Sequence, residues 1–270
     1  MINYKDYFKP LPDLKKYLNR IFIEESRNSS LDYLDELILA HQYAVPFENI
    51  DIFDYKKQIE ISTDSIFDKV VKRNRGGYCF ELNTLFYKLL LACGYEVYPT
   101  LARVVKYGES YLPSLHRLTI IKYDNSLYVC DVGFGSVQPG FALKIEGGLE
   151  QTSKNGLAQT FKVEEKNGWW KINYRSKNSW ENTIMFNLRE QEEVDFVSPN
   201  YYTCNSENAI FTQKRMVNLR TENGNKSIDS DTFIQIENHQ RIETPIEYEK
   251  ERNRILEAHF GIRIGEASGS

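Results

Sequence analysis

The sequence predicts an α+β protein in which a helical region comes first, a β-rich region follows and a short mixed region ends the chain. Three observations indicate this fold class. Apolar residues recur at helical spacing up to about residue 93, at alternate positions after Gly94, and in both patterns beyond about residue 205. The chain has 270 residues, which fits one large domain or two to three small ones. We expect three parts: a helical part at residues 1–100, a β-rich part at 101–205 and a mixed part at 206–270.

The helical region contains four predicted helices, over residues 13–22, 30–44, 62–73 and 79–94. Ser30 is a suitable N-cap for the second helix, because its hydroxyl can accept a hydrogen bond from the first turn. The fourth helix begins at Cys79 and ends at Gly94, a residue that favours a helix C-terminus.

The β-rich region contains segments with the two-residue period of strands, over residues 95–107, 116–123, 126–134 and 161–176. Asn167-Gly168 interrupts the last of these and predicts a tight hairpin. In the final region, residues 209–221 resemble a strand. Residues 245–261 predict a helix with a proline near its start and Gly261 after its end.

Charge and composition exclude several classes of protein. The formal net charge is −4 and acidic and basic residues are interleaved, so a nucleic-acid partner is not expected. No apolar run is long enough to span a bilayer, and no secretory signal begins the chain. The four cysteines are widely spaced and form no metal-binding pattern. We therefore expect a cytoplasmic protein with reduced thiols and without a metal.

Cys79 stands at a predicted helix start, directly after Gly76 and Gly77. The glycines would allow a sharp turn that strains other residues. Free N–H groups and the dipole at a helix N-terminus stabilise a thiolate and can hold an oxyanion. However, Cys79 also shares an apolar helix face, so a buried structural cysteine fits this position too. Cys93, late in the same helix, is best interpreted as structural.

His116 is the histidine that offers a partner for this thiol, whereas His41 is better explained as a packed histidine. Residues 116–134 predict a hairpin with Asp124-Asn125 as its two-residue loop. That register pairs Tyr123 with Ser126, His116 with Gly133 and Leu118 with Asp131. His116 and Asp131 then become diagonal neighbours within reach of each other. A carboxylate beside a histidine fixes its tautomer, although Asp131 could instead be a turn residue.

The chain resembles the arylamine N-acetyltransferase family. "RGGYCFELN" resembles the family's active-site motif, and three other stretches follow in the family's order. These are "AVPFENID" (44–51), "LHRLTII" with the histidine and "YVCDVGFG" with the aspartate. The resemblance extends from the first helices to "ILEAHFGI" near the end. It is most specific between about residues 30 and 140, and weaker from 141 to 240.

The resemblance implies that the three parts are a helical bundle that carries the nucleophile, an antiparallel β-barrel and an α/β lid, with a catalytic core similar to those of cysteine proteases and transglutaminases. It also implies ping-pong chemistry. Acetyl-CoA acylates Cys79, CoA leaves, and an arylamine, hydrazine or arylhydroxylamine takes the acetyl group. His116 would act as general base and acid, and Asp131 would orient it.

By the same resemblance, Phe47 and Phe134 would line the acceptor pocket, although core packing also explains Phe47. Leu112, Pro113 and Ser114 match a loop that helps to hold CoA through its backbone. Arg75 would act structurally, with Glu48 or Glu81 as its partner.

Two other functions fit the same residues. One is a cysteine hydrolase or transglutaminase-like acyl transferase, which peptide cleavage or labelling by glutamine donors would reveal. The other is a catalytically silent binding protein, for which Cys79 would be unreactive at neutral pH. The natural acceptor amine, the preferred acyl chain and the oligomeric state do not follow from the sequence.

Overall fold

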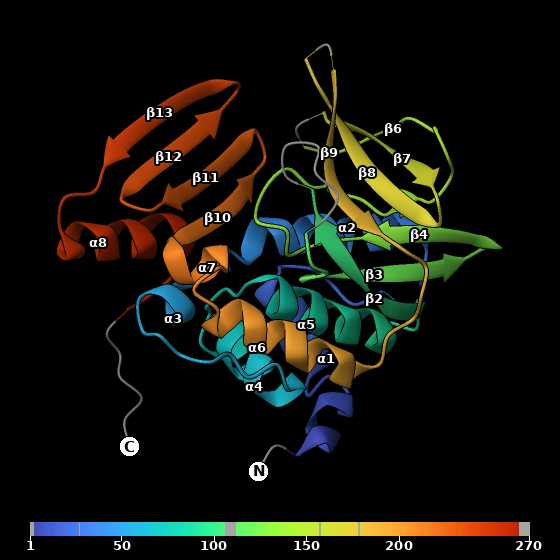
Figure 1. The fold of residues 1–270 in the computed structure, drawn as a ribbon, viewed down its shortest axis with the longest axis horizontal. Helices are drawn as coiled ribbons and strands as arrows, with labels where there is room; N and C mark the ends of the chain where they lie inside the picture. The colour runs from blue at the N-terminus through green and yellow to red at the C-terminus, as the bar shows by residue number, and fades with distance from the viewer. Residues whose placement is uncertain (1–2, 27, 106–111, 157, 178, 265–270) are drawn as a thin grey trace.

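The computed structural model describes residues 3–26, 28–105, 112–156, 158–177 and 179–264. Helices surround the buried helix α5, an eight-stranded sheet stands at one side, and a five-stranded sheet with helix α8 stands at the other (Figure 1). The predicted α+β class is confirmed. None of the helices within these ranges combines the length and the apolar character needed to cross a lipid bilayer.

The helical part contains the four helices expected from the sequence, together with two short helical elements that were not predicted, at residues 4–8 and 50–53. They are η1 Tyr4–Phe8, α1 Leu14–Arg20, α2 Leu31–Ala44, α3 Ile50–Phe53, α4 Thr63–Phe67, η2 Asp68–Lys72 and α5 Cys79–Ala92. The predicted N-cap of α2 is confirmed, because the Ser30 hydroxyl accepts the amide hydrogen of Tyr33. Helix α4 and the π-helical turn η2 together form the helix predicted over residues 62–73. Gly94 ends α5 with a φ of 85°.

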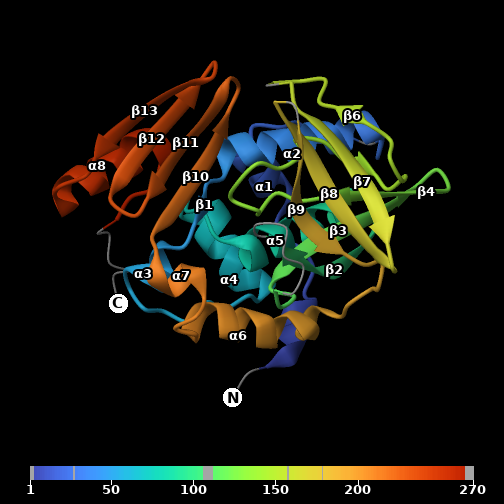
Figure 2. The same ribbon diagram turned by 45° about the horizontal axis from the view of Figure 1, so that its top comes forward.

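The β-rich part forms one antiparallel sheet in the order β5-β4-β3-β2-β9-β8-β7-β6. Its strands are β2 Glu96–Val104, β3 His116–Tyr123, β4 Ser126–Cys130, β5 Leu143–Lys144, β6 Gln151–Thr152, β7 Thr160–Lys166, β8 Trp169–Ser176 and β9 Ser179–Phe186. A bridge between Gly147 and Val163 links the region after β5 to β7, so the sheet nearly closes into a barrel (Figure 2). Both predicted two-residue hairpin loops are confirmed.

The remaining elements are η3 Glu193–Phe196, α6 Val197–Asn205, α7 Ile210–Gln213, β10 Met216–Thr221, β11 Gly224–Asp229, β12 Thr232–Glu237, β13 Gln240–Pro245 and α8 Glu249–Phe260. A short strand, β1 Phe47–Glu48, joins this second sheet beside β10. The prediction of a strand from residue 209 is wrong in its first half, which forms α7. There the hydroxyl of Thr212 bonds to the carbonyl oxygens of Ser206 and Ala209, a local pattern that competes with a strand.

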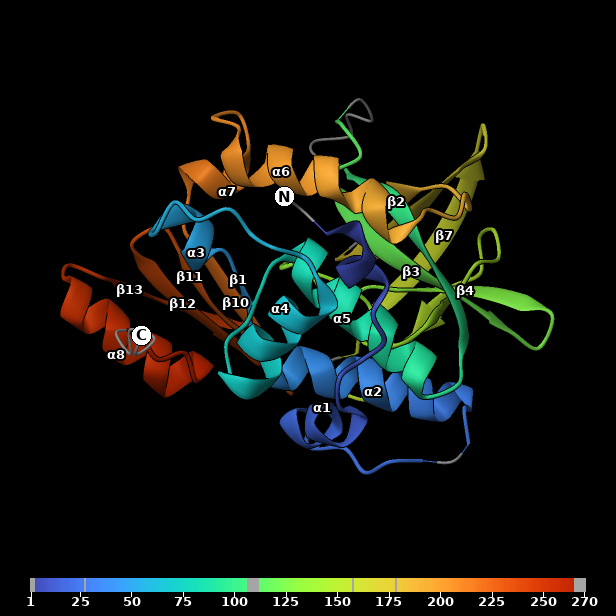
Figure 3. The same cartoon turned by 90° about the horizontal axis from the view of Figure 1, so that it is seen from below.

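The described residues form three hydrophobic cores, which lie under the helices, inside the eight-stranded sheet, and between the second sheet and α8. Figure 3 shows α6 on one side of α4 and α5, with α1 and α2 on the other. The chain crosses between these cores, since Phe196 and Cys204 pack into the helical one and Ile50 into the C-terminal one. The divisions at residues 100 and 205 remain predictions.

Candidate active site

The turn that leads into α5 is shaped by two glycines. A Cβ on Gly76 would overlap the carbonyl oxygen of Pro46, and one on Gly77 would come within 2.8 Å of the Glu81 side chain. Neither glycine has a positive φ. The expectation that they permit a strained turn is therefore wrong. They are needed because the backbone around Pro46 and the first turn of α5 approach so closely.

Cys79 is the first residue of α5 and is only 2% exposed. Its thiol donates to the carbonyl oxygen of Leu115, with 3.8 Å between sulfur and oxygen. Burial raises the pKa of this thiol well above its usual value, and Asp131 raises it further, while the amide of Phe80 acts in the opposite direction. The first turn of α5 thus favours the thiolate, as the sequence predicts, but the effect of burial on the pKa of Cys79 is larger.

His116 and Asp131 are in direct contact. The Nε2 atom of His116 lies 2.7 Å from Oδ2 of Asp131, and both side chains are buried. The predicted register is confirmed from Tyr123↔Ser126 to Thr119↔Cys130, where the ladder ends. The two further pairs, His116 with Gly133 and Leu118 with Asp131, are not part of it. The chain leaves the ladder there because Asp131 Oδ1 accepts the amide hydrogen of Gly133.

Asp131 is held by partners from two other elements, one bonded to its carboxylate and one to its main chain. Its Oδ1 atom also accepts a hydrogen bond from Asn83 Nδ2 on α5, at 2.8 Å. Asn83 in turn accepts the amide hydrogen of Val132. The Nε2 atom of Gln42 on α2 donates to the main-chain oxygen of Asp131 at 3.0 Å. Sequence reasoning missed Gln42, whose only signal is a polar residue beside His41 on a helix that becomes buried.

Gly133 brings the nucleophile's helix against the loop that follows Asp131. A Cβ on Gly133 would lie 3.1 Å from Cα of Cys79 and 3.0 Å from Asn83 Nδ2. The start of α5 and the end of the β3–β4 hairpin are therefore packed together. The sequence alone left this contact between helix and hairpin open.

The two predicted pocket aromatics have different surroundings. The ring of Phe134 meets the His116 ring edge to face, with 5.7 Å between their centroids, and it is half-buried. Phe47 is 5% exposed and packs against Phe211 and the backbone of Gly135. Phe47 thus has the core packing that was its alternative explanation. A role in acceptor binding remains a prediction for both.

The three residues predicted to hold CoA lie directly before β3. Leu112 and Pro113 are exposed, and the Ser114 hydroxyl accepts a hydrogen bond from Arg103 Nε at 3.2 Å. Residues 106–111, the other part of the segment between β2 and β3, lie outside the described ranges. The contacts of these three residues with CoA remain predictions.

Two further expectations are confirmed. Arg75 pairs with Glu48, with 2.8 Å between Nη2 and Oε1. His41 is fully buried and bonds through Nδ1 to the Tyr17 hydroxyl at 2.9 Å. Burial lowers the pKa of His41 to about 3, so its ring is neutral at physiological pH.

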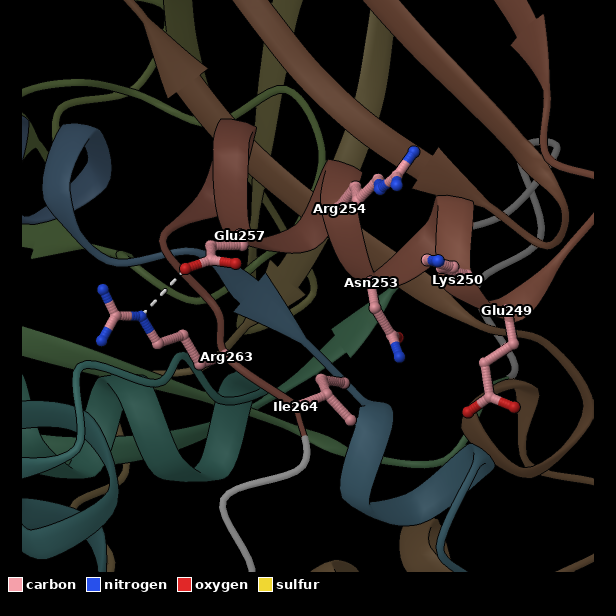
Figure 4. A pocket seen from close by; sticks show the side chains of 7 residues that line it. All are labelled: Glu249, Lys250, Asn253, Arg254, Glu257, Arg263 and Ile264. Atoms are coloured by element: carbon pink, nitrogen blue, oxygen red, sulfur yellow. Dashed lines mark hydrogen bonds and ion pairs between the residues drawn. The ribbon is translucent and has the colours of Figure 1, made fainter.

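A hollow of about 810 Å³ lies along α8, lined by residues between Glu249 and Ile264 (Figure 4). Its lining mixes acidic and basic side chains, and two of them, Glu257 and Arg263, pair with each other at 3.1 Å. None of the predicted site residues lines this hollow. The candidate active site is the arrangement around Cys79, where a thiol, an imidazole and a carboxylate are supplied by α5, β3 and the loop after β4.

Known proteins are similar to this chain in sequence and in fold. A family model described as N-acetyltransferase matches residues 30–268. The chain is 31% identical to human arylamine N-acetyltransferase 1, over 93% of this chain and 94% of that protein. It is 26% identical to the arylamine N-acetyltransferase of Escherichia coli, over 95% of this chain and 91% of that protein.

Solved structures agree with this similarity. The arylamine N-acetyltransferase from Salmonella typhimurium aligns with a TM-score of 0.89 at 23% identity, covering 97% of this chain and 95% of that one. The Mycobacterium marinum enzyme in complex with CoA aligns with a TM-score of 0.85 at 23% identity, covering 93% of both chains. The Bacillus cereus enzyme, described as having a Cys-His-Glu triad, aligns with a TM-score of 0.81 at 25% identity, covering 93% of this chain and 98% of that one.

Proposed function

Because the chain belongs to the arylamine N-acetyltransferase family, we propose that it transfers an acetyl group from acetyl-CoA to an arylamine, a hydrazine or an arylhydroxylamine. The observation that carries this proposal has two parts. His116 and Asp131 form a buried pair, and Gly133, two residues after Asp131, packs against Cys79 at the start of α5. This arrangement supplies a thiol, an imidazole and a carboxylate, the three groups that covalent acyl transfer uses.

In the proposed first half-reaction, Cys79 attacks the thioester carbonyl of acetyl-CoA. Asp131 occupies Nε2 of His116, which leaves Nδ1 to take the thiol proton. Proton transfer produces a thiolate and an imidazolium together, which offsets the effect of burial on the thiol. The N–H groups at the start of α5 stabilise the oxyanion. The tetrahedral intermediate collapses, CoA leaves as the thiol with the proton from His116, and Cys79 holds the acetyl group.

In the second half-reaction, the amine attacks the Cys79 thioester. His116 takes the proton that the amine loses and returns it to the leaving thiol. A thioester suits this step because a thiolate leaves easily, so the intermediate remains reactive to amines. The burial of Cys79 keeps bulk water away and favours amine transfer over hydrolysis.

We assign the acid of this triad to Asp131. The B. cereus relative is described with glutamate in its triad, whereas the carboxylate that touches His116 in this chain belongs to an aspartate. The hydrogen bonds from Asn83 and Gly133 support this assignment, because they hold the carboxylate with its second oxygen directed at the imidazole.

Substrate binding is assigned to the residues that surround the triad. The M. marinum relative was solved with CoA, which supports acetyl-CoA as the donor here. Leu112, Pro113 and Ser114 would contact CoA from the segment before His116. Phe134, whose ring meets His116, would contact the acceptor's aromatic ring, with Phe47 beside it.

Intact-protein mass spectrometry tests the proposal. Acetyl-CoA alone should add one acetyl group that maps to Cys79, and an aromatic amine should then remove it. Cys79→Ala should gain no acetyl group and keep the same fold. An unmodified wild-type protein, under conditions where a thiol reagent labels Cys79, would contradict acetyl-CoA as the donor and favour another acyl transfer or hydrolysis.

A further inference from the structure

A cluster of five buried or nearly buried charges lies next to the start of α5. We call it the buried charge cluster; it consists of Glu48, Asp51, Lys69, Arg75 and Glu81. The Lys69 ammonium is its centre, at 2.8 Å from Glu81, 2.9 Å from Asp51 and 3.6 Å from Glu48. The family motif singled out Arg75, but the proposed reaction assigns nothing to Lys69.

The buried charge cluster holds the residues that precede the nucleophile. Glu81 accepts the amide hydrogen of Tyr78 with Oε2 at 3.1 Å, while its other oxygen accepts from Lys69. The amide of Glu48 donates to the carbonyl oxygen of Gly77 at 2.8 Å. The main chain on the N-terminal side of Cys79 is therefore fixed by Glu81 and by the strand residue Glu48.

The formal charge of the cluster depends on Lys69. Three carboxylates face two cations, so the cluster carries −1, and it would carry −2 without the ammonium. Burial raises the pKa of the Glu81 carboxyl and Lys69 opposes that shift. Burial alone would lower the pKa of Lys69, but the three carboxylates raise it above its usual value, so the ammonium stays charged.

The charge of the cluster acts on the Cys79 thiol together with several other titratable groups. From β3 and the loop after β4 come His116 and Asp131, from α6 comes Cys204, and Tyr78 stands next in the chain. Glu81 and Asp131 both disfavour a Cys79 thiolate. Tyr78 and Cys204 are neutral at physiological pH because burial raises the pKa of each. Among these groups, Glu81 is the one whose charge Lys69 neutralises directly.

We propose that Lys69 is a positioning residue: it keeps Glu81 ionised as the acceptor of the Tyr78 amide hydrogen at the start of α5, and it cancels the charge of Glu81 near Cys79. The thiol and His116 can then exchange a proton at neutral pH. This inference rests on the proposed role of Cys79 as nucleophile. It assigns the electrostatic tuning of that nucleophile to a side chain that lies outside the triad.

The test is the pH dependence of Cys79 alkylation by iodoacetamide, an uncharged reagent, with modification mapped by mass spectrometry. Lys69→Met should move the midpoint upward by about one pH unit, since it removes a buried charge close to the helix start. Lys69→Arg retains the charge and should keep the wild-type midpoint. In Lys69→Met/Glu81→Gln the cluster again carries −1, so the midpoint should return toward that of the wild type.

Glu81→Gln alone removes a negative charge and should lower the midpoint, which keeps the proposal testable when Lys69→Met fails to fold. Lys88→Met is the matched control. Lys88 is a buried lysine on α5, the helix of Cys79, but it pairs with Glu193, so the alkylation midpoint of this variant should equal that of the wild type. Unchanged midpoints in both Lys69→Met and Glu81→Gln, or an equal shift in Lys88→Met, would overturn the proposal. Alkylation requires neither acetyl-CoA nor an amine, so failure of acetyl transfer would be seen separately.

Discussion

The imidazole of His116 and the carboxylate of Asp131 are 2.7 Å apart, although the two residues are 15 positions apart in the chain. The two-residue turn at Asp124-Asn125 sets the register of β3 and β4 as far as Thr119↔Cys130, and Asp131 follows directly after that ladder. An ionised carboxylate can only accept hydrogen bonds, so Nε2 of His116 carries the proton in this contact. Nδ1 is then the nitrogen available for proton transfer.

Replacing Asp131 by Asn should slow acetyl transfer by about 10³-fold or more while the protein stays folded. The amide oxygen can still accept from Asn83 and Gly133. The amide nitrogen then faces His116 Nε2, which must become the acceptor, so Nδ1 carries the proton and can no longer take one from the thiol. Steady-state rates and thermal unfolding would check this. Activity within tenfold of the wild type would argue against the assigned acid.

Gly76→Ala should lower the free energy of unfolding by at least about 2 kcal/mol, because the new Cβ would overlap the Pro46 carbonyl oxygen. Gly147→Ala is the matched control, since no heavy atom lies within 4 Å of its added Cβ and its φ is not positive. The control should differ from the wild type by less than about 0.5 kcal/mol in urea unfolding. Equal stabilities for the two variants would contradict the close approach.

The stability of the protein should fall as the pH drops below about 6.5, partly because of His41. Its pKa is about 3 in the folded protein and about 6.5 in the unfolded chain. Between these values the unfolded state binds more protons, so stability decreases with falling pH, by about 1.6 kcal/mol from this residue between pH 6.5 and 5.

His41→Asn isolates this contribution. Asn retains an acceptor for the Tyr17 hydroxyl and does not titrate. The variant should be less stable than the wild type at pH 7.5, since it loses packing against Phe86, but its stability should depend less steeply on pH. Other groups titrate in both proteins, so the difference between their urea-unfolding curves reports His41. Parallel pH profiles would rule out this contribution.

Arg220→Met should weaken the support of Asp131 from the second sheet. Arg220 on β10 donates to Gln42 Oε1 at 3.0 Å, and Gln42 donates to the main-chain oxygens of Asp131 and Pro139. Without Arg220, the buried Gln42 oxygen loses this donor, at a cost of about 1–3 kcal/mol. We expect lower stability and slower acetyl transfer.

Arg241→Met serves as the control for Arg220, because Arg241 is an exposed residue of the same sheet that pairs with Glu243 on its own strand. It should change stability by less than about 1 kcal/mol and leave the transfer rate unchanged. Similar effects of both substitutions would mean that the loss of any arginine from this sheet has the same consequence, and that the bond from Arg220 to Gln42 is not the cause.

The parts of the site that the sequence predicted depend on local patterns. The cap at Ser30, the start of α5 at Cys79 and the turn at Asp124-Asn125 are each fixed by residues within a few positions of one another. Helix α7 was predicted as a strand, because its four residues are too few for a helical period to be seen. Gln42 was missed because nothing local distinguishes it from a surface residue.

The sequence by itself determined the order of helical and β-rich regions, the position of the thiol at a helix start, and the pairing of His116 with Asp131. Only the tertiary structure decided that the hairpin packs on α5 through Gly133 and that Gly76 is required by the approach of Pro46. It also decided that burial, rather than the helix dipole, dominates the environment of the Cys79 thiol. Local hydrogen bonds and side-chain periodicity act over a few residues and can be recognised along the chain. Desolvation and contacts between distant segments depend on which surfaces meet in the folded protein.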